Sequence, residues 1–238
     1  MNEQRFQENR GVTTISQRGG KEPEIYGRRF TPEQEAKKKL VWETLCREIF
    51  QRYIPNDGVV LDIGAGDGVF IKNIRARRKF AVDVSPDVHR LEAFGVTPLE
   101  MPATDFASHI AEPVDVVFMS NFLEHLPHKQ LVLDVLEECH RALAPGGKVM
   151  ILQPNIRYVG AAYWDYIDHH IALTEHSLVE ALEVSGFRIV RLVPRFLPYT
   201  IKSKLGLFSG LIGWYLRLPL LWRIFGQQTF VVAERVER

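Results

Sequence analysis

The chain has 238 residues, of which 46% are hydrophobic and 25% are charged, and its formal net charge is +1. This composition is typical of a globular protein with one full core, and the near-zero charge gives no support for nucleic acid as a partner. The chain has 2 cysteines, too few for a disulfide framework, so we expect a reduced, cytoplasmic protein. Because residues 1–10 are polar, we expect no signal peptide.

The predicted elements alternate between helices and strands. A polar, mobile tail over residues 1–29 is expected before a helix that starts at Thr31-Pro32-Glu33, where a hydroxyl cap precedes a proline. Alternating strands and helices predict a doubly wound α/β fold whose mainly parallel sheet is covered on both faces. The expected strands are 59–63, 80–84, 114–121, 148–153, 187–193 and 229–233, and the later helices are 69–79, 128–143 and 174–185, with helix and short-strand signals over 88–101.

A glycine-rich turn, residues 62–68, follows the first strand and has three glycines at alternate positions behind Asp62. A dinucleotide-binding turn has the spacing Gly-x-Gly-x-x-Gly, and Val69 stands where its third glycine belongs. Asp62 and Asp67 would repel a pyrophosphate and attract a ligand with a positive centre. S-adenosylmethionine is such a ligand, and Asp83 at the tip of the next strand can accept hydrogen bonds from its ribose hydroxyls.

These features resemble the class I S-adenosylmethionine-dependent methyltransferases of the small-molecule, type 11 kind. The strand from Asp115, the Glu-His-Leu at 124–126 and the Leu-Ala-Pro-Gly-Gly at 143–147 extend the resemblance over roughly residues 55–193. It implies a seven-stranded sheet with an antiparallel last strand, in a methyltransferase domain over residues 30–238. It also implies cofactor contacts from Asp62, Gly64, Ala65, Gly66, Asp83, Val84, Thr104, Asp105 and Asn121.

One position departs from the family's pattern. Many relatives have an acid at the tip of the third strand that holds the adenine amino group, but Pro102 occupies that place here. Either Asp105 replaces this acid, or backbone groups of Ala103 and Thr104 do. Asp105 could equally be a turn residue, a role that aspartate often has.

Histidines are the candidate bases, because a hydroxyl acceptor must lose its proton at or before methyl transfer. Residues 163–170 lie beyond the carboxyl end of the fifth strand, where open α/β sheets bind ligands. We expect the acceptor pocket there, with His169 or His170 as the base and Asp168 as its orienting partner. His125 is a further candidate, which could instead pack beside the cofactor turn. The alternative for 163–170 is a structural loop whose histidines are satisfied by nearby acids.

Two further patterns limit the chemistry. The spacing of these histidines with His176 matches no familiar set of ligands, so no metal is predicted. Methyltransferases that act on nucleic-acid amines often carry Asn/Asp-Pro-Pro-Tyr after the fourth strand. Residues 120–123 read Ser-Asn-Phe-Leu instead, which disfavours nucleic acid as the acceptor.

Residues 194–228 form an apolar, basic insert between two strands that normally make a tight hairpin. No Asp or Glu occurs between Glu183 and Glu234, and the uncharged run 205–216 is shorter than the ~20 residues that span a bilayer. Apolar, tryptophan-bearing and basic segments are typical of peripheral contact with a membrane. We expect such contact through residues 205–225, at the inner face of the membrane, or else a helical cap over the acceptor site or a dimer face.

The insert and residues 163–170 together resemble methyltransferases of bacterial surface-polysaccharide and glycolipid pathways. The implied acceptor is a sugar hydroxyl, on a small molecule or on a lipid-linked glycan. Two alternatives stay open: a methyltransferase acting on carbon or nitrogen of a soluble metabolite, and a non-catalytic membrane adaptor with a cofactor fold. Nothing in the sequence indicates the oligomeric state.

Overall fold

The computed structural model describes residues 32–199 and 211–237. The predicted mobile tail, 1–29, and the first part of the uncharged run 205–216 lie outside the described residues. So does Thr31, the predicted cap of the first helix. The expectations for the tail, the helix cap and the start of the uncharged run therefore stay predictions.

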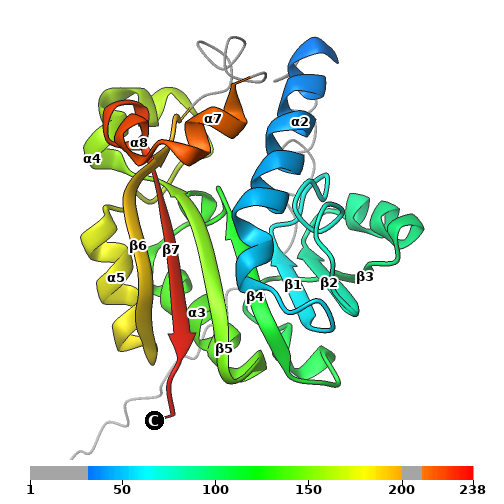
Figure 1. Cartoon of the computed structure of the whole chain (residues 1–238). Coiled ribbons are helices and arrows are strands. Elements are labelled where there is room, and N and C mark those ends of the chain that lie inside the picture. The colour runs from blue at the N-terminus through cyan, green and yellow to red at the C-terminus, as the bar shows by residue number, and fades with distance from the viewer. Residues whose placement is uncertain (1–31, 200–210, 238) are drawn as a thin grey trace, which may run out of the picture.

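A seven-stranded sheet forms the centre of the molecule (Figure 1), in the order β3-β2-β1-β4-β5-β7-β6. Only β7 runs antiparallel to its neighbours, β5 and β6. This arrangement confirms the predicted mainly parallel, doubly wound sheet with an antiparallel last strand. The strands are β1 (Val59–Ile63), β2 (Arg78–Asp83), β3 (Thr97–Glu100), β4 (Val114–Ser120), β5 (Leu143–Pro154), β6 (Phe187–Leu197) and β7 (Gln228–Arg235).

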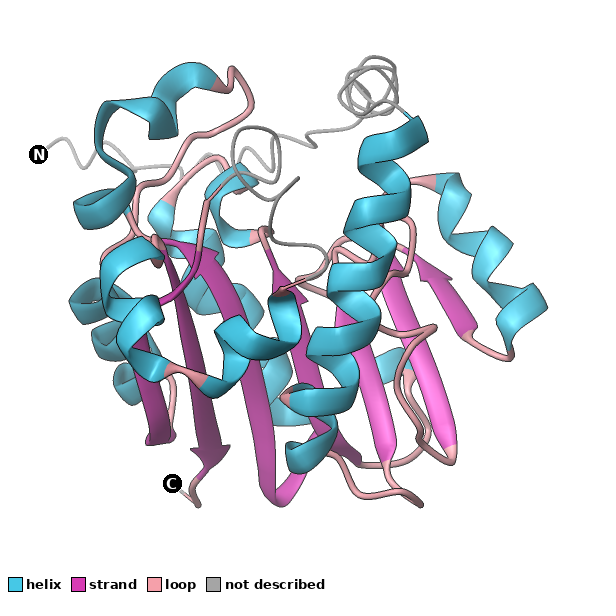
Figure 2. Cartoon of the chain, turned by 45° about the horizontal axis from the view of Figure 1, so that its top comes forward, coloured by secondary structure: helices cyan, strands magenta, loops and turns pink. Residues whose placement is uncertain are grey.

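Helices cover both faces of the sheet (Figures 1 and 2), and each face has its own apolar core. Successive strand side chains point to opposite faces, so Val60 and Phe118 join one core while Leu61 and Val117 join the other. The first core includes α2 (Pro32–Glu48), α7 (Ile212–Arg217) and α8 (Pro219–Phe225); the second includes α3 (Lys129–Ala142) and α5 (Glu175–Val184). The short helices are η1 (Phe50–Tyr53), η2 (Pro86–Phe94), η3 (Ala107–His109), η4 (Leu123–His125), α4 (Ile156–Val159) and η5 (Gly160–Asp165).

The prediction of a helix directly after the glycine turn is wrong. Residues 69–73 form hydrogen-bonded turns, and β2 begins at Arg78, so Arg78 and Lys79, at the end of the predicted helix, belong to a strand. The side-chain amide of Asn73 donates to the Val69 carbonyl at 2.9 Å, which a regular helix would pair with the backbone N–H of Asn73. Asn73 therefore closes a turn in place of a helix.

Smaller differences concern the ends of strands. The strand predicted over 148–153 starts earlier, because β5 begins at Leu143, and the register between β4 and β5 shifts between Leu143 and Lys148. β6 continues to Leu197, four residues past its predicted end at Val193, and pairs with β7 as far as Gln228. The insert thus begins on an extended strand.

The described part of the insert, α7 and α8, is anchored to the core by polar groups of its aromatic residues. The Tyr215 hydroxyl donates to the Phe196 carbonyl at 2.6 Å, and the Trp222 indole donates to the Tyr215 carbonyl at 2.8 Å. Within residues 32–199 and 211–237, no helix has the length and hydropathy needed to cross a membrane. One face of the insert is therefore fixed to the sheet, and the other face carries exposed apolar residues.

Candidate active site

The turns after β1, β2, β4 and β5 meet at the carboxyl edge of the sheet, at the top of Figure 1. Backbone hydrogen bonds join these turns in pairs. Gly64 donates to the Val82 carbonyl, and Asn121 donates to the Leu152 carbonyl, both at 2.9 Å. Residues far apart in the sequence are thus held at one edge.

The three glycines of the turn have positive φ angles of 64°, 51° and 69°. A Cβ on Gly64 would lie 2.6 Å from the Phe122 ring, and one on Gly68 would lie 2.4 Å from Leu91. A Cβ on Gly66 would meet nothing within 4 Å. Packing therefore requires glycine at 64 and 68, whereas the space beside the Gly66 Cα is open.

Asp83 connects the glycine turn to the turn after β2. Its carboxylate accepts the Gly66 N–H and the Ser85 N–H, each at 2.9 Å. The adjacent Val84 side chain is 66% exposed although it is apolar. A carboxylate has about four lone-pair sites, so Asp83 keeps acceptor capacity for hydroxyl groups.

Asp62 is buried inside β1 next to this turn. Burial raises the pKa of its carboxyl well above the usual range; the Ile71 backbone N–H opposes this, and Asp83 and Asp67 add to it. A negative charge at Asp62 is therefore unfavourable until a positive group approaches. The carboxylates, the open Gly66 and the exposed Val84 fit a cationic ligand with a ribose and an apolar base better than a pyrophosphate.

The other cofactor candidates lie at the same edge. The Thr104 hydroxyl donates to Asp105 at 3.0 Å, and the Asp105 N–H donates to the Pro102 carbonyl at 3.3 Å, which makes Asp105 part of a turn. Asn121 has a φ of 47°, uncommon for a residue other than glycine. Ala65 is buried within the glycine turn. Contacts from these residues to the cofactor remain predictions.

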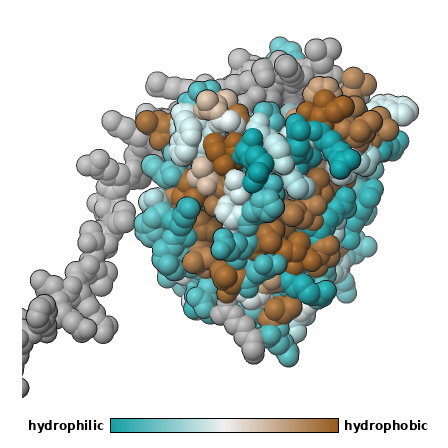
Figure 3. All heavy atoms as spheres, turned by 90° about the vertical axis from the view of Figure 1, so that its left-hand side faces the viewer, coloured by the Kyte–Doolittle hydropathy of each residue, from teal (hydrophilic) through white to brown (hydrophobic). Residues whose placement is uncertain are grey.

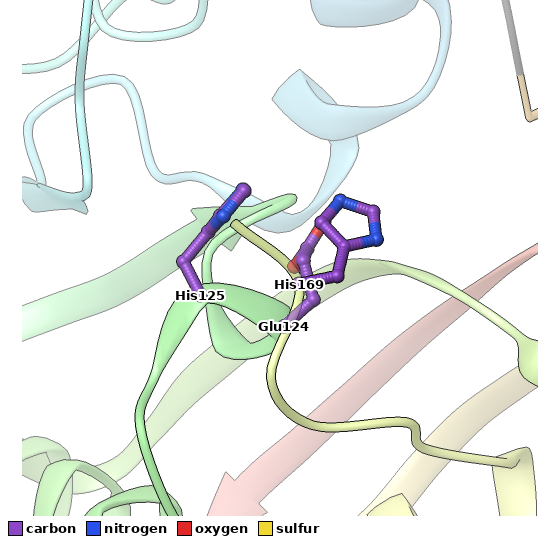
Figure 4. Close-up of side chains that lie close together, drawn as sticks. All are labelled: Glu124, His125 and His169. Atoms are coloured by element: carbon purple, nitrogen blue, oxygen red, sulfur yellow. The ribbon is translucent and has the colours of Figure 1, made fainter. Parts of the chain in front are cut away.

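A cluster of Glu124, His125 and His169 lies beyond β4 and β5 (Figure 4). One potential ligand atom from each residue lies within 4.8 Å of the others. The Glu124 carbonyl accepts the N–H groups of His170 and Ile171 at 2.8 and 3.2 Å, which holds the two segments together. Two of the three residues were predicted catalytic candidates.

Backbone carbonyls determine the tautomers of both clustered histidines. His125 Nδ1 lies 3.0 Å from the Asp168 carbonyl oxygen and 3.4 Å from the Asp168 carboxylate. His169 Nδ1 lies 2.8 Å from the Tyr163 carbonyl oxygen. A carbonyl oxygen can only accept, so each Nδ1 carries the hydrogen and each neutral ring has its lone pair on Nε2. Asp168 thus lies beside His125, and not at His169 or His170, the histidines that it was expected to orient.

Glu124 is the residue that the sequence prediction missed. Its side chain is 1% exposed, and within the described chain its Oε2 atom has no hydrogen-bond partner. Burial raises the pKa of its carboxyl, and His125 partly offsets this effect. The only signal in the sequence was the Glu-His pair itself, directly after a strand tip.

The structure separates His169 from its neighbours in sequence. His169 packs between the rings of Tyr163 and Tyr166, at centroid distances of 4.7 and 5.2 Å. His170 is exposed, and His176 is exposed beside Glu175 at 3.5 Å, so neither joins the cluster. This arrangement favours His169 over His170 as the functional histidine.

Residues 36–192 match the methyltransferase domain family. Among curated proteins, the chain is similar to a ubiquinone biosynthesis O-methyltransferase of Pseudomonas syringae pv. tomato, with 30% identity over 105 residues. That match covers 40% of this chain and 44% of the relative. The chain thus spans less than half the length of this curated relative.

Solved structures share the fold at low sequence identity. A SAM-dependent methyltransferase from Archaeoglobus fulgidus is 22% identical, with a TM-score of 0.61 and coverage of 83% of this chain and 94% of that one. The N-methyltransferase NodS from Bradyrhizobium japonicum, in complex with S-adenosyl-L-homocysteine, is 14% identical. Its TM-score is 0.55, with coverage of 87% of this chain and 89% of that one.

Proposed function

The chain belongs to the methyltransferase domain family, and on this premise we propose that it transfers the methyl group of S-adenosylmethionine to a hydroxyl oxygen. The proposal of an oxygen acceptor rests mainly on two imidazoles, His125 and His169. Both lie at the edge of the sheet that holds the glycine turn, and each has its lone pair on Nε2. The 105-residue match to a relative named an O-methyltransferase supports the same choice.

The chain's residues supply position and a proton acceptor. S-adenosylmethionine, when bound, supplies a methyl group that is already activated for displacement. Asp83, Gly66 and Val84 would hold its ribose and base, and buried Asp62 would face its positive charge. A hydroxyl is a poor nucleophile until its proton leaves, and a positioned base contributes about 10²–10⁴-fold to such a step. His169 Nε2, with His125 beside it, is the proposed proton acceptor.

The acceptor that we propose is a sugar hydroxyl, on a small molecule or on a lipid-linked glycan. Exposed apolar residues surround the cluster's segment, with Trp164 55% and Ile167 85% exposed. Tyr166 also approaches Tyr199, at the start of the insert, with ring centroids 6.0 Å apart. Aromatic surfaces of this kind can pack against sugars and apolar chains.

A second candidate acceptor is a ring hydroxyl on an aromatic molecule with an apolar tail. The name of the Pseudomonas syringae relative, which refers to ubiquinone biosynthesis, favours this candidate. Methylation of a soluble metabolite on carbon or nitrogen would not require a base, so it would leave the Glu124–His125–His169 cluster without a catalytic role. A non-catalytic adaptor would not need the cluster at all.

The proposal is tested by following a labelled methyl group. The purified chain is incubated with methyl-deuterated S-adenosylmethionine and three acceptors: a lipid-linked saccharide, a catechol with a prenyl tail, and the amine analogue of that catechol. We expect the deuterated methyl group on an oxygen of one hydroxyl acceptor, detected by mass spectrometry, and none on the amine. Transfer to nitrogen or carbon alone would contradict the proposal.

We also propose peripheral contact with the inner face of the cytoplasmic membrane through the insert. α7 and α8 expose several large apolar residues next to Arg217 and Arg223, and Figure 3 shows apolar side chains gathered on the face near α8. Apolar burial and attraction to anionic lipid would act together at this surface. The exposed residues are Leu211, Trp214, Leu218, Leu220, Ile224 and Phe225.

Replacing Trp214 by Ser and Arg217 by Gln together should weaken sedimentation with phosphatidylglycerol vesicles by at least about tenfold. The reason is that one exposed aromatic ring and one positive charge are lost, both from the outer face of α7. The matched control replaces Phe94 by Ser and Arg90 by Gln, which are also exposed, on η2. Equal sedimentation of the two double variants would contradict membrane contact and would favour a cap over the acceptor site or a dimer face.

A further inference from the structure

The Glu124–His125–His169 cluster has the composition of a metal site. A carboxylate oxygen and two imidazole nitrogens, from η4 and from the segment after η5, lie within 4.8 Å of one another. Both imidazoles donate through Nδ1 to backbone carbonyls, at 3.0 and 2.8 Å. Metal-binding histidines usually have this arrangement, with one ring nitrogen held by an acceptor and the other directed at the ion.

A second observation points to a missing ligand at the same place. Glu124 Oε2 is buried without a hydrogen-bond partner, and both side-chain amide atoms of the buried Gln153 are likewise unpaired within the described chain. The Gln153 amide lies close enough to the Glu124 carboxyl to lower its pKa as a hydrogen-bond donor, although the pair does not reach regular hydrogen-bond geometry. Unpaired buried polar atoms are uncommon in folded proteins, and an ion or a water molecule usually accounts for them.

We propose that Glu124, His125 and His169 bind a divalent transition-metal cation. Two imidazoles with one carboxylate suit Zn²⁺, Mn²⁺, Fe²⁺ or Co²⁺, whereas Mg²⁺ and Ca²⁺ prefer oxygen ligands. Its charge would offset the cost of a buried carboxylate at Glu124. Three protein ligands leave at least one coordination position for an oxygen atom of a substrate.

The existing geometry is close to what coordination needs. Metal–ligand distances of about 2.0–2.2 Å place tetrahedral ligand atoms about 3.3–3.5 Å apart. The distances between the three ligand atoms, which are at most 4.8 Å now, must therefore shorten by no more than about 1.5 Å. Rotation of the side chains can provide this change. The backbone need not move, because the Glu124 carbonyl already holds the second segment through His170 and Ile171.

The role of the cation rests on the proposed function. An acceptor hydroxyl bound at the open position would have a lowered pKa, as a metal-bound water has. Its proton would pass to solvent, its oxygen lone pair would form the new C–O bond, and the electrons of the broken C–S bond would remain on sulfur. In the metal-dependent reaction the two imidazoles bind the cation. The cation, and not His169, then makes the acceptor oxygen nucleophilic.

The test measures metal binding directly on the whole chain. After dialysis against EDTA, the protein is titrated with CoCl₂, followed by visible absorption, and with ZnCl₂ and MgCl₂, followed by calorimetry. We expect about one Co²⁺ or Zn²⁺ per chain and much weaker Mg²⁺ binding. Affinity should rise with pH, because protons compete with the ion for imidazole and carboxylate ligands.

Matched variants locate the site. Glu124→Gln and His169→Ala should each weaken Co²⁺ binding by at least about tenfold, with His125→Ala as a substitute if Glu124→Gln does not fold. The control variants, His170→Ala and His176→Ala, remove exposed histidines outside the cluster and should bind like the unaltered chain. Equal binding by the cluster variants and the controls would overturn the proposal.

The same experiment separates this proposal from the proposed function. Full methyl transfer to oxygen by metal-free protein in EDTA would overturn the role of the cation and leave O-methylation standing. Co²⁺ binding that depends on Glu124 and His169, in a protein that methylates only nitrogen or carbon, would support the metal site and contradict the O-methylation proposal.

Discussion

Asp83→Ala is expected to reduce the affinity for S-adenosylmethionine by about 100-fold or more. The carboxylate is the proposed acceptor for both ribose hydroxyls, and a hydrogen bond to a charged group contributes about 1.5–3 kcal/mol. Alanine would also release the Gly66 and Ser85 N–H groups, now held at 2.9 Å, and so loosen the turn that faces the ligand. Isothermal titration with S-adenosylmethionine and S-adenosylhomocysteine measures the change.

The matched control for this variant is Asp87→Ala, on the same turn after β2. Asp87 is exposed and pairs with Arg90 at 2.9 Å, outside the glycine turn. It should keep the affinity of the unaltered chain. Thermal melting of both variants shows whether Asp83→Ala is folded. A folded Asp83→Ala protein that binds within about threefold of the unaltered chain would contradict the assignment of Asp83.

The fold was predictable because its signals are local. Runs of apolar residues predicted the buried strands, which contribute to both cores, and the matches confirm a methyltransferase domain with the predicted fold. Thr174 caps α5 as its sequence position suggests, with the Ser177 N–H donating to its hydroxyl at 3.2 Å. The helix predicted over 69–79 is not formed, and the Asn73 side chain bonds the Val69 carbonyl that a helix would pair with a backbone N–H.

The site was predictable only in part, because burial and orientation depend on the tertiary structure. His169 and His170 are equivalent by composition and spacing, and only the path of the chain past the Glu124 carbonyl places one inside and the other in solvent. Glu124 resembles any other acid until its side chain is known to be 1% exposed. A buried acid without a partner is a property of the packed structure.

His169 and His170 are adjacent in sequence but are expected to differ in their importance for catalysis. His169 has its Nδ1 held by the Tyr163 carbonyl at 2.8 Å, so its Nε2 can accept a proton from a hydroxyl or bind a cation. Either role requires the imidazole at this position. His170 contributes its backbone N–H to the Glu124 carbonyl, which alanine would preserve. Position 170 is therefore a control with the same change of side chain.

His169→Ala should lower kcat for methyl transfer by about 10²–10⁴-fold, the usual contribution of a positioned general base. The affinity for S-adenosylmethionine should stay unchanged, because the glycine turn and Asp83 are untouched. His170→Ala should keep kcat within about twofold. Turnover is measured by S-adenosylhomocysteine release. Full turnover in both variants would show that neither His169 nor His170 deprotonates the acceptor.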